Sequence, residues 1–307
     1  MEELMKKVTF IFSLAGVLLY CASQAAYSSD PEKVGASTCM GCHSDQVEAF
    51  KKNTHAKTLP AVKKISFEES CETCHGPGSL HAEAAGDKTN PGFASIKNPK
   101  KLSVSESSET CLKCHENGNR AFWKGSQHES RDVSCLNCHS MHHSKTDPLM
   151  VKNNEAETCY QCHQIRKAQS LRSSHMPLRD GKMQCSSCHN PHGSAGPKLL
   201  AQNSTNENCY ACHAEKRGPF LWEHAPVREN CLNCHEAHGS QHDKLLKVKR
   251  PRLCQQCHIE SRHPTTAGAD PDAFEAGLTN IGGSRACTQC HAQIHGSNHP
   301  AGARLQR

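Results

Sequence analysis

One five-residue pattern, Cys-x-x-Cys-His, occurs ten times in this chain and uses all but one of its 21 cysteines. The histidines that end the ten copies are His43, His75, His115, His139, His163, His189, His213, His235, His258 and His291. The pattern is the attachment signature of a c-type haem, in which two thiols form thioethers with the porphyrin and the histidine binds the iron. A chain with this many motifs must fold around the groups that are bound to them.

The cysteines of the motifs are the predicted attachment sites, and they are Cys39, Cys42, Cys71, Cys74, Cys111, Cys114, Cys135, Cys138, Cys159, Cys162, Cys185, Cys188, Cys209, Cys212, Cys231, Cys234, Cys254, Cys257, Cys287 and Cys290. Five four-cysteine zinc ribbons would use the same cysteine spacing, but a ribbon needs nothing at the following position. Disulfides and thioredoxin-like dithiols leave the histidine equally unexplained. We therefore predict ten covalent c-type haems as the cofactors.

The spacing of the motifs groups them into five pairs. In the three central pairs the second motif opens the sequence Cys-His-x-x-His, and a leucine follows at a constant offset, as Leu149, Leu199 and Leu245. We expect a signal peptide over residues 1–25 and an elongated decahaem domain over 26–307. The five haem pairs of that domain are predicted over 39–81, 111–142, 159–192, 209–238 and 254–295.

Each pair holds two further histidines, one between its motifs and one after them. They are His55, His81, His128, His142, His175, His192, His224, His238, His263 and His295. A lone histidine is more simply a surface or core residue, but ten at repeat positions favour ligation, because histidine is a usual axial ligand of haem iron. We predict them as the distal ligands of ten low-spin irons, whereas His143, His242 and His299 fall outside the repeat.

Chain reach limits which iron each distal histidine can serve. Two imidazoles on opposite sides of one iron hold their Cα atoms about 12–13 Å apart, whereas three residues span at most about 11 Å. His142 therefore should not serve the haem held by His139. We expect a crossed arrangement within each pair, which assigns His142 to the Cys111 haem, His128 to Cys135, His192 to Cys159, His175 to Cys185, His238 to Cys209 and His224 to Cys231, and which extends to the more loosely spaced outer pairs.

The N-terminus has the form of an export signal. Lys6 and Lys7 precede an apolar run over 8–20 that is too short to span a membrane, and small residues before Ala26 suit cleavage. A lipid anchor would use Cys21, but the bulky Tyr20 precedes it, so we expect Cys21 to leave with the signal. The formal charge of +6 does not indicate a nucleic-acid partner, because each haem would bring two carboxylates.

Composition bears on the fold. Hydrophobic residues make up 36% of the chain and aromatic residues 5%, which is lean for an ordinary core. We expect a multihaem cytochrome c fold, with short helices and irregular loops wrapped around a row of ten haems and little or no sheet. Helices are predicted over 47–57 and 157–170, and loops over 82–105 and 264–285. The porphyrins would then supply the core, each repeat burying its haems against its neighbours.

The ten motifs, the export signal and the Cys-His-x-x-His sequences resemble those of the MtrA/DmsE/PioA family of periplasmic decahaem c-type cytochromes, over residues 39–295. The resemblance implies bis-histidine haems in a chain, inserted into an outer-membrane β-barrel porin as the wire of a conduit for extracellular electron transfer, in metal reduction or iron oxidation. It also implies a periplasmic location at the outer membrane. The implied partners are the porin, a periplasmic or inner-membrane cytochrome, and an extracellular multihaem cytochrome.

The sequence leaves three functions open. The first is an electron carrier or conduit without catalytic residues. The second is a multihaem oxidoreductase acting on a small nitrogen compound, and the third is a free periplasmic electron shuttle. An enzyme needs an iron with an open position or an altered motif, and all ten motifs are intact. The segment 54–56 or the long gap before Cys287 could still hold a five-coordinate haem.

We predict that the mature protein begins near Ala26 and carries ten covalent haems, because all ten motifs are intact. Intact-mass spectrometry of the purified holoprotein checks the count. A mass short by one or more haems would contradict it.

Overall fold

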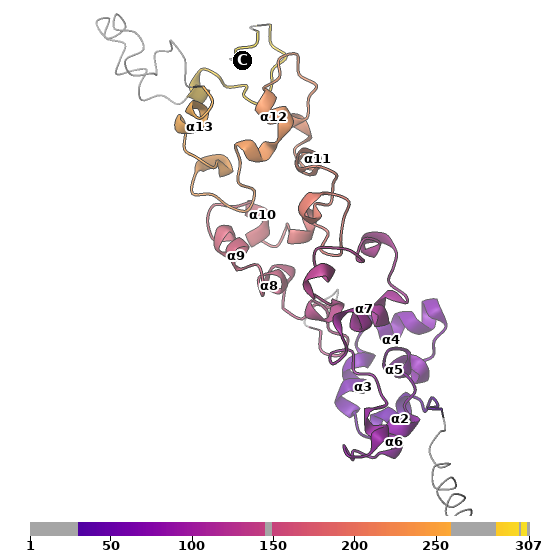
Figure 1. Cartoon of the computed structure of the whole chain (residues 1–307). Coiled ribbons are helices and arrows are strands. Elements are labelled where there is room, and N and C mark those ends of the chain that lie inside the picture. The colour runs from indigo at the N-terminus through magenta and orange to yellow at the C-terminus, as the bar shows by residue number, and fades with distance from the viewer. Residues whose placement is uncertain (1–29, 145–148, 259–286, 301, 306–307) are drawn as a thin grey trace, which may run out of the picture. The chain divides into compact units, whose positions relative to one another are not determined.

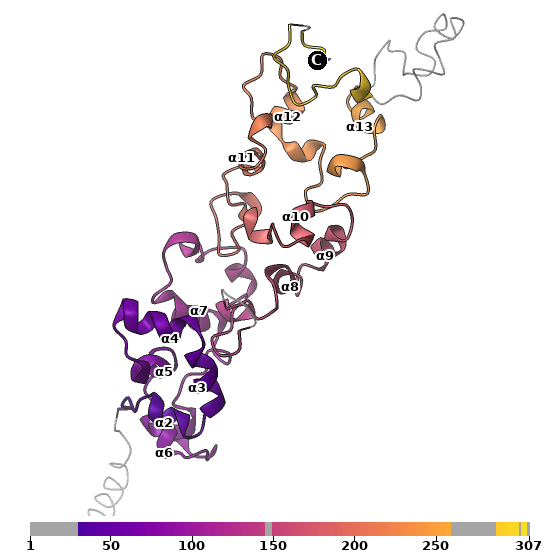
Figure 2. The same ribbon diagram turned by 180° about the vertical axis from the view of Figure 1, so that it is seen from behind.

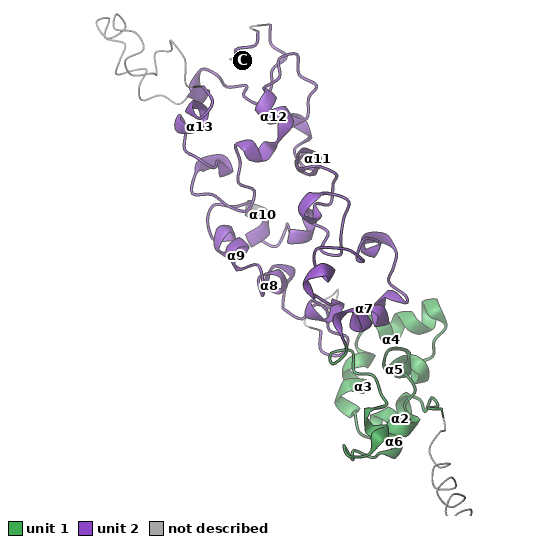
Figure 3. Cartoon of the chain, in the orientation of Figure 1, with its two compact units in different colours: residues 1–102 green, residues 103–307 purple. Residues whose placement is uncertain are grey.

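The computed structural model describes residues 30–144, 149–258, 287–300 and 302–305. The expected signal peptide over 1–25, His263 and the expected loop over 264–285 lie outside the described residues. The chain divides into two compact units, residues 1–102 and 103–307 (Figure 3). This boundary falls between the second and third motifs, and the division into five haem pairs stays a prediction.

Unit 1 consists of short helices joined by tight turns. They are α2 (Ala36–Met40), α3 (Ser44–Lys51), α4 (Thr54–Thr58), η1 (Leu59–Lys63), α5 (Phe67–His75), α6 (Ser79–Glu83) and η2 (Pro91–Ala94). The helix expected over 47–57 is thus divided into α3 and α4. Asn53 lies between them, and its side chain caps α4 by accepting a hydrogen bond from the His55 backbone N–H at 2.7 Å.

In unit 2 the helices from α7 to α11 follow one another in chain order, and α12 and α13 lie side by side at the end away from α7 (Figures 1 and 2). They are α7 (Val104–Leu112), η3 (Gly118–Arg120), η4 (Glu129–Arg131), η5 (Cys135–Asn137), α8 (Glu155–Cys159), α9 (Gln164–Ser170), α10 (Met176–Arg179), η6 (Cys185–Ser187), η7 (Pro197–Leu199), α11 (Thr205–Tyr210), η8 (Ala214–Lys216), α12 (Ala225–Glu229), η9 (Cys231–Asn233), η10 (Asp243–Leu245), α13 (Arg252–Gln255) and η11 (Cys287–Gln289). The helix expected over 157–170 is two helices, α8 and α9, because a haem motif interrupts it.

The expectation of short helices and loops with little or no sheet is confirmed. Across the described ranges the only extended pairings are isolated β-bridges, such as the one between His189 and Leu200. Apolar burial is also sparse: among the described side chains, no large one is fully buried. The buried apolar residues are Ala36, Val47, Leu59, Ala84, Leu112, Trp123, Met150, Leu246 and Leu305. Side chains alone therefore supply only a thin core.

Capped helices lead into the first motif of several pairs. α7 begins with a capping box of Ser103 and Glu106, α8 with Asn154 and α11 with Ser204. In α8 and α11 the capping side chain accepts the backbone N–H of the third helical residue, at 2.8 and 3.1 Å. Such caps satisfy N–H groups that a helix start leaves free, so even helices of five or six residues form next to the first cysteine.

Each motif folds as one helical turn. Outside α5, the histidine N–H of every motif donates to the carbonyl of the first cysteine, with N···O distances of 2.9–3.1 Å. The remaining motif, from Cys71 to His75, lies within α5. Because residues three and four apart share a face of a helix, this turn places both thiols and the imidazole on one side.

Polar clamps join the two motifs of a pair. Glu155 accepts both the backbone N–H and the hydroxyl of Ser186, each at 2.7 Å. Asn206 accepts the backbone N–H of Cys231 at 2.8 Å. In unit 1 the buried carboxylate of Glu72 accepts backbone N–H groups at 2.9–3.0 Å from Val34, Gly35 and Gly78. In these pairs, polar side chains therefore connect the two motifs or the segments beside them.

Neighbouring pairs meet where a glycine follows a distal histidine. The φ angles of Gly193 and Gly239 are +112° and +140°, and a Cβ at these positions would lie 2.0 Å from the Phe122 oxygen and 2.1 Å from the Gln169 oxygen. Next to this contact, the Ser240 N–H donates to the Ser173 carbonyl at 2.8 Å. Only glycine therefore allows the turn of one pair to approach the backbone of the preceding pair.

We predict that Gly239→Ala lowers the melting temperature of the holoprotein much more than Gly181→Ala. Both glycines have positive φ, so each substitution costs about 1–2 kcal/mol in backbone strain. Only the Cβ at position 239 also meets a carbonyl, whereas nothing lies within 4 Å of a Cβ at position 181. Thermal unfolding of the two variants measures the difference, and equal melting temperatures would contradict the close approach.

Candidate haem-binding sites

Motif histidines and distal histidines meet as pairs of facing rings. In six such pairs the ring centroids are 6.0–6.2 Å apart. The pairs are His43 with His81, His128 with His163, His139 with His192, His189 with His238, His224 with His258 and His235 with His295. Each contains one motif histidine and one predicted distal histidine.

This separation suits two imidazoles bound to opposite sides of one metal ion. With metal–nitrogen bonds of about 2 Å and ring nitrogens about 1.1 Å from their ring centres, the centroids would be about 6.2 Å apart. In five of the six pairs the ring planes also lie within 12–19° of each other, the exception being His128 with His163 at 64°. The residues therefore fit an axially ligated iron.

Burial keeps these rings neutral. It lowers the pKa of His192 to about 4, with the charges of His139 and nearby groups acting in the same direction. Burial also lowers the pKa values of His224, His238 and His295. Because a buried imidazole disfavours the charged form, these rings retain a nitrogen lone pair at neutral pH. A metal needs that lone pair.

Hydrogen bonds at Nδ1 fix which nitrogen is available on three distal rings. His81 donates to the Phe93 carbonyl at 2.8 Å, and His128 donates to the Pro191 carbonyl at 2.7 Å. His175 donates to the Ala237 carbonyl at 2.9 Å. A carbonyl can only accept, so Nδ1 carries the proton and Nε2 carries the lone pair. This arrangement is usual for metal-binding histidines.

Four of the five second-motif histidines have the same kind of bond. Their Nδ1–H groups donate to backbone carbonyls at 2.6–3.1 Å, with His75 bonded to Lys97, His189 to Lys198, His235 to Lys244 and His291 to Arg304. These four motif histidines therefore also present Nε2. These four histidines are half-buried. The first-motif histidines are exposed to solvent, and they are His43, His115, His163, His213 and His258.

Two of the residues whose carbonyls accept these bonds lie in left-handed backbone. Lys198 and Leu199 have φ angles of 54° and 58°, and Lys244 and Leu245 have 54° and 55°. Residues with a side chain pay about 1–2 kcal/mol each for this conformation. The leucine carbonyls are held in return by the backbone N–H groups of Asn190 and Glu236, both at 2.7 Å. The leucine repeat in the sequence marks this loop, but the basic residue before it was missed.

The thiols of successive motifs are neighbours throughout unit 2. Within a pair the first cysteines meet: hydrogen bonding with Cys111 lowers the pKa of Cys135 to about 7, and Cys185 raises that of Cys159. Between pairs the second cysteines meet, and after burial the largest influence raising the pKa of Cys138 is Cys162. The same relations join the remaining motifs, through Cys188 with Cys212, Cys209 with Cys231, Cys234 with Cys257 and Cys254 with Cys287.

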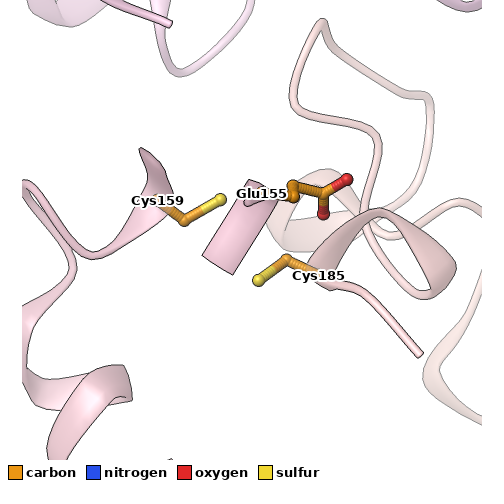
Figure 4. Close-up of side chains that lie close together, drawn as sticks. All are labelled: Glu155, Cys159 and Cys185. Atoms are coloured by element: carbon orange, nitrogen blue, oxygen red, sulfur yellow. The ribbon is translucent and has the colours of Figure 1, made fainter. Parts of the chain in front are cut away.

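One junction resembles a separate metal site. A carboxylate oxygen of Glu155 and the sulfurs of Cys159 and Cys185 lie within 4.8 Å of one another (Figure 4). Both thiols belong to haem motifs, and Glu155 already accepts two hydrogen bonds from Ser186. The cluster is therefore the contact between the two motifs of a pair.

The crossed assignment of distal ligands is wrong for the central pairs. His192 faces His139 of the preceding pair instead of the Cys159 motif, and His238 faces His189 instead of the Cys209 motif. Likewise His128 faces His163 of the following pair. His224 faces His258, again in the following pair. Chain reach excluded the iron of the histidine's own motif, but it could not identify the nearest ring in space, which belongs to a neighbouring pair.

The remaining histidines differ in what they face and in how far they are buried. In the outer pairs the crossed rule holds only in part: His81 faces His43 within the first pair, as expected, whereas His295 faces His235 of the preceding pair. His55, His142 and His175 are half-buried, and burial lowers the pKa of His55. His263 lies outside the described residues. Of the histidines outside the repeat, His143 and His299 are exposed.

The described part of the chain contains no helix that is long and apolar enough to cross a membrane. Three family models match in succession: Cytochrome c554 and c-prime over residues 38–70, Cytochrome c-type protein NrfB-like over 71–156, and Doubled CXXCH motif over 175–218 and 224–263. They agree with the motifs in assigning c-type haem.

The whole chain also aligns with a curated relative. It is 38% identical over 333 positions to the multiheme cytochrome MtrA of Shewanella baltica (strain OS185), and the alignment covers 100% of this chain and 98% of that protein. Matches of this extent are not confined to the motifs. The chain therefore belongs to the MtrA-type multihaem cytochromes, which transfer electrons through c-type haems.

Proposed function

We propose that this protein binds ten c-type haems with two histidines each and serves as the electron wire of a porin–cytochrome conduit across the outer membrane. The observation that carries the proposal is the set of six facing imidazole pairs with centroids 6.0–6.2 Å apart. Haem iron, when bound, accepts one electron and gives it up again. The chain's own residues fix where it is held and what can reach it.

Paired imidazoles favour electron transfer over substrate chemistry. A ring on each side of an iron leaves no open position, and metal catalysis on a small molecule needs one. Histidine on both sides also keeps potentials low, because methionine ligation is what raises them. The imidazole pairs thus support an electron carrier rather than a reductase of small nitrogen compounds.

The repeat allows one more distal histidine, His175, to be assigned to an iron. His128 and His224 each face the first motif histidine of the following pair. His175 occupies the same position in its own pair and has the same carbonyl bond as His128, so we assign it to the iron of His213. Three distal candidates, His55, His142 and His263, then remain for the irons of His75, His115 and His291.

The closeness of successive motifs supports the proposed electron path. From Cys111 to Cys287 each motif neighbours the next through its thiols, alternately by first and by second cysteines. Groups attached to these thiols are therefore neighbours in chain order. The relationship to MtrA supports a periplasmic site at the outer membrane, a barrel partner, and cytochromes on either side as donor and acceptor.

We predict that His192→Ala turns one haem, the one attached at Cys135, from low-spin to high-spin, because the ring opposite His139 is lost. Electron paramagnetic resonance counts the high-spin iron, and intact mass confirms that all haems remain. His242→Ala, which removes a histidine outside the repeat, should leave every haem low-spin.

A double substitution identifies the iron. If His139 and His192 share one iron, His139→Met combined with His192→Ala should still alter one haem. Two altered haems would mean that His192 serves a different iron, such as the one at Cys159.

We predict that the holoprotein co-purifies with an outer-membrane β-barrel when membranes are solubilised in a mild detergent. Haem counting of the purified complex gives the stoichiometry. Recovery of the whole pool as free protein in the soluble periplasmic fraction would favour a shuttle over a conduit.

A further inference from the structure

The backbone carbonyls that hold the second-motif histidines share an unexpected property. For four of the five second-motif histidines the carbonyl belongs to a basic residue, namely Lys97, Lys198, Lys244 or Arg304. The residue at the matching position after His139 is Pro148, which carries no charge. A backbone carbonyl accepts a hydrogen bond whatever its side chain, and lysine and arginine together account for only 36 of 307 residues. The hydrogen bond to histidine therefore does not explain why each of these residues is basic.

The four side chains form no ion pair with another side chain in the described ranges of the protein. All four residues are exposed. The ion pairs found among the described residues involve other basic residues, including Lys124, Arg217 and Arg228, and none of these four. They are cations placed beside a motif histidine without an anion from the chain.

Backbone conformation argues that two of these side chains are needed. Lys198 and Lys244 both have a φ angle of 54°, in the left-handed region where glycine is favoured. Glycine would present the same carbonyl to the histidine with less strain. A lysine at both positions indicates that the ammonium group contributes something that glycine would lose.

We propose that Lys97, Lys198, Lys244 and Arg304 bind the propionate carboxylates of the haems whose motif histidines their own carbonyls hold. This inference rests on the haem binding proposed above. The propionates are the anionic groups of a c-type haem, and ammonium and guanidinium groups form charge-assisted hydrogen bonds with carboxylates. One residue then acts twice at each site, with its backbone orienting the imidazole and its side chain neutralising a carboxylate.

The arrangement has an electrostatic consequence for the iron. A cation next to a propionate offsets its negative charge, and so favours the reduced haem relative to a haem with unpaired propionates. The basic residues would thus raise the potentials of the haems attached at Cys71, Cys185, Cys231 and Cys287. Because the effect arises within one protein, it needs no partner.

Amine labelling of the isolated holoprotein tests the proposal site by site. We expect an N-hydroxysuccinimide ester to modify Lys97, Lys198 and Lys244 about tenfold more slowly than the exposed lysines Lys182 and Lys249, as peptide mass spectrometry would show. An ion-paired ammonium is held protonated and is the poorer nucleophile. Equal rates in the isolated protein would overturn the proposal. If addition of a partner protein then slowed the reaction, the carboxylates would belong to that partner.

Potentiometry of two matched double variants gives a second test. Lys198→Gln with Lys244→Gln should lower the ratio of reduced to oxidised iron about tenfold for two haems at a fixed applied potential, a shift of about 59 mV for a one-electron couple. Lys182→Gln with Lys249→Gln removes the same charge and should leave the titration unchanged. Identical curves for the two variants would overturn the proposal.

Failure of this inference is distinct from failure of haem binding. Haem count by intact mass and a fully low-spin spectrum in both variants would show that the proposed ligation stands. Lys198→Gly keeps the carbonyl and relieves the strained φ. It should therefore leave the His189 ligand in place but reproduce the shift in potential for the haem at Cys185 alone.

Discussion

An imidazole can bind iron only with a free lone pair that points at the metal, and much of this structure follows from meeting that requirement many times over. A backbone carbonyl at Nδ1 settles both the proton and the orientation of a ring. For His128 and His175 the carbonyl comes from the following pair, at Pro191 and Ala237. The contact that prepares a ligand is therefore also a contact that joins two repeats. With so thin a side-chain core, contacts of this kind have to organise the fold.

The facing pairs are asymmetric in how their rings are held. In the pairs of His81 with His43 and of His128 with His163, the distal ring bonds to a carbonyl. In the pairs of His189 and His235 with their partners, the motif ring does so. A metal ion bound to one fixed ring defines where the second ring must lie, so one fixed ring is sufficient. In the pair of His189 with His238 the second ring also lies 3.5 Å from a carboxylate oxygen of Glu236.

The sequence indicated candidate haem-binding residues more readily than it indicated which histidine rings would face one another. A motif of two cysteines and a histidine folds as one helical turn wherever it occurs, so the attachment residues could be predicted from spacing alone. Repeat positions singled out the ten distal candidates, and six of them face a motif histidine. Their partners could not be predicted, because chain reach gives only a maximum separation. The position of His192 beside His139 depends instead on a backbone approach between pairs, which Gly193 allows.

The conformation of the loop between Cys-His-x-x-His and the following leucine also could not be predicted from the sequence. The constant leucine offset marked a repeat, but nothing in the sequence indicated left-handed backbone at Leu199 and Leu245 or the bonds from Lys198 and Lys244 to the motif histidines. Non-glycine residues seldom adopt this conformation, and so local propensity argues against it. The conformation is stable only because the hydrogen bonds of the whole loop compensate for it. Such a cost is a property of the folded state, which a single sequence does not reveal.

Rings that face one another across pairs also couple the stability of neighbouring pairs in unit 2. In a simple repeat protein each repeat contributes its own stability and one interface with each neighbour. Here the interface contains the facing rings: the ring facing His189 comes from the following pair, and the ring facing His163 comes from the preceding one. A pair that loses its fold leaves rings unopposed on both sides. Because the same facing rings would define both the repeat interfaces and the electron path, a break in that path is also a break in the fold.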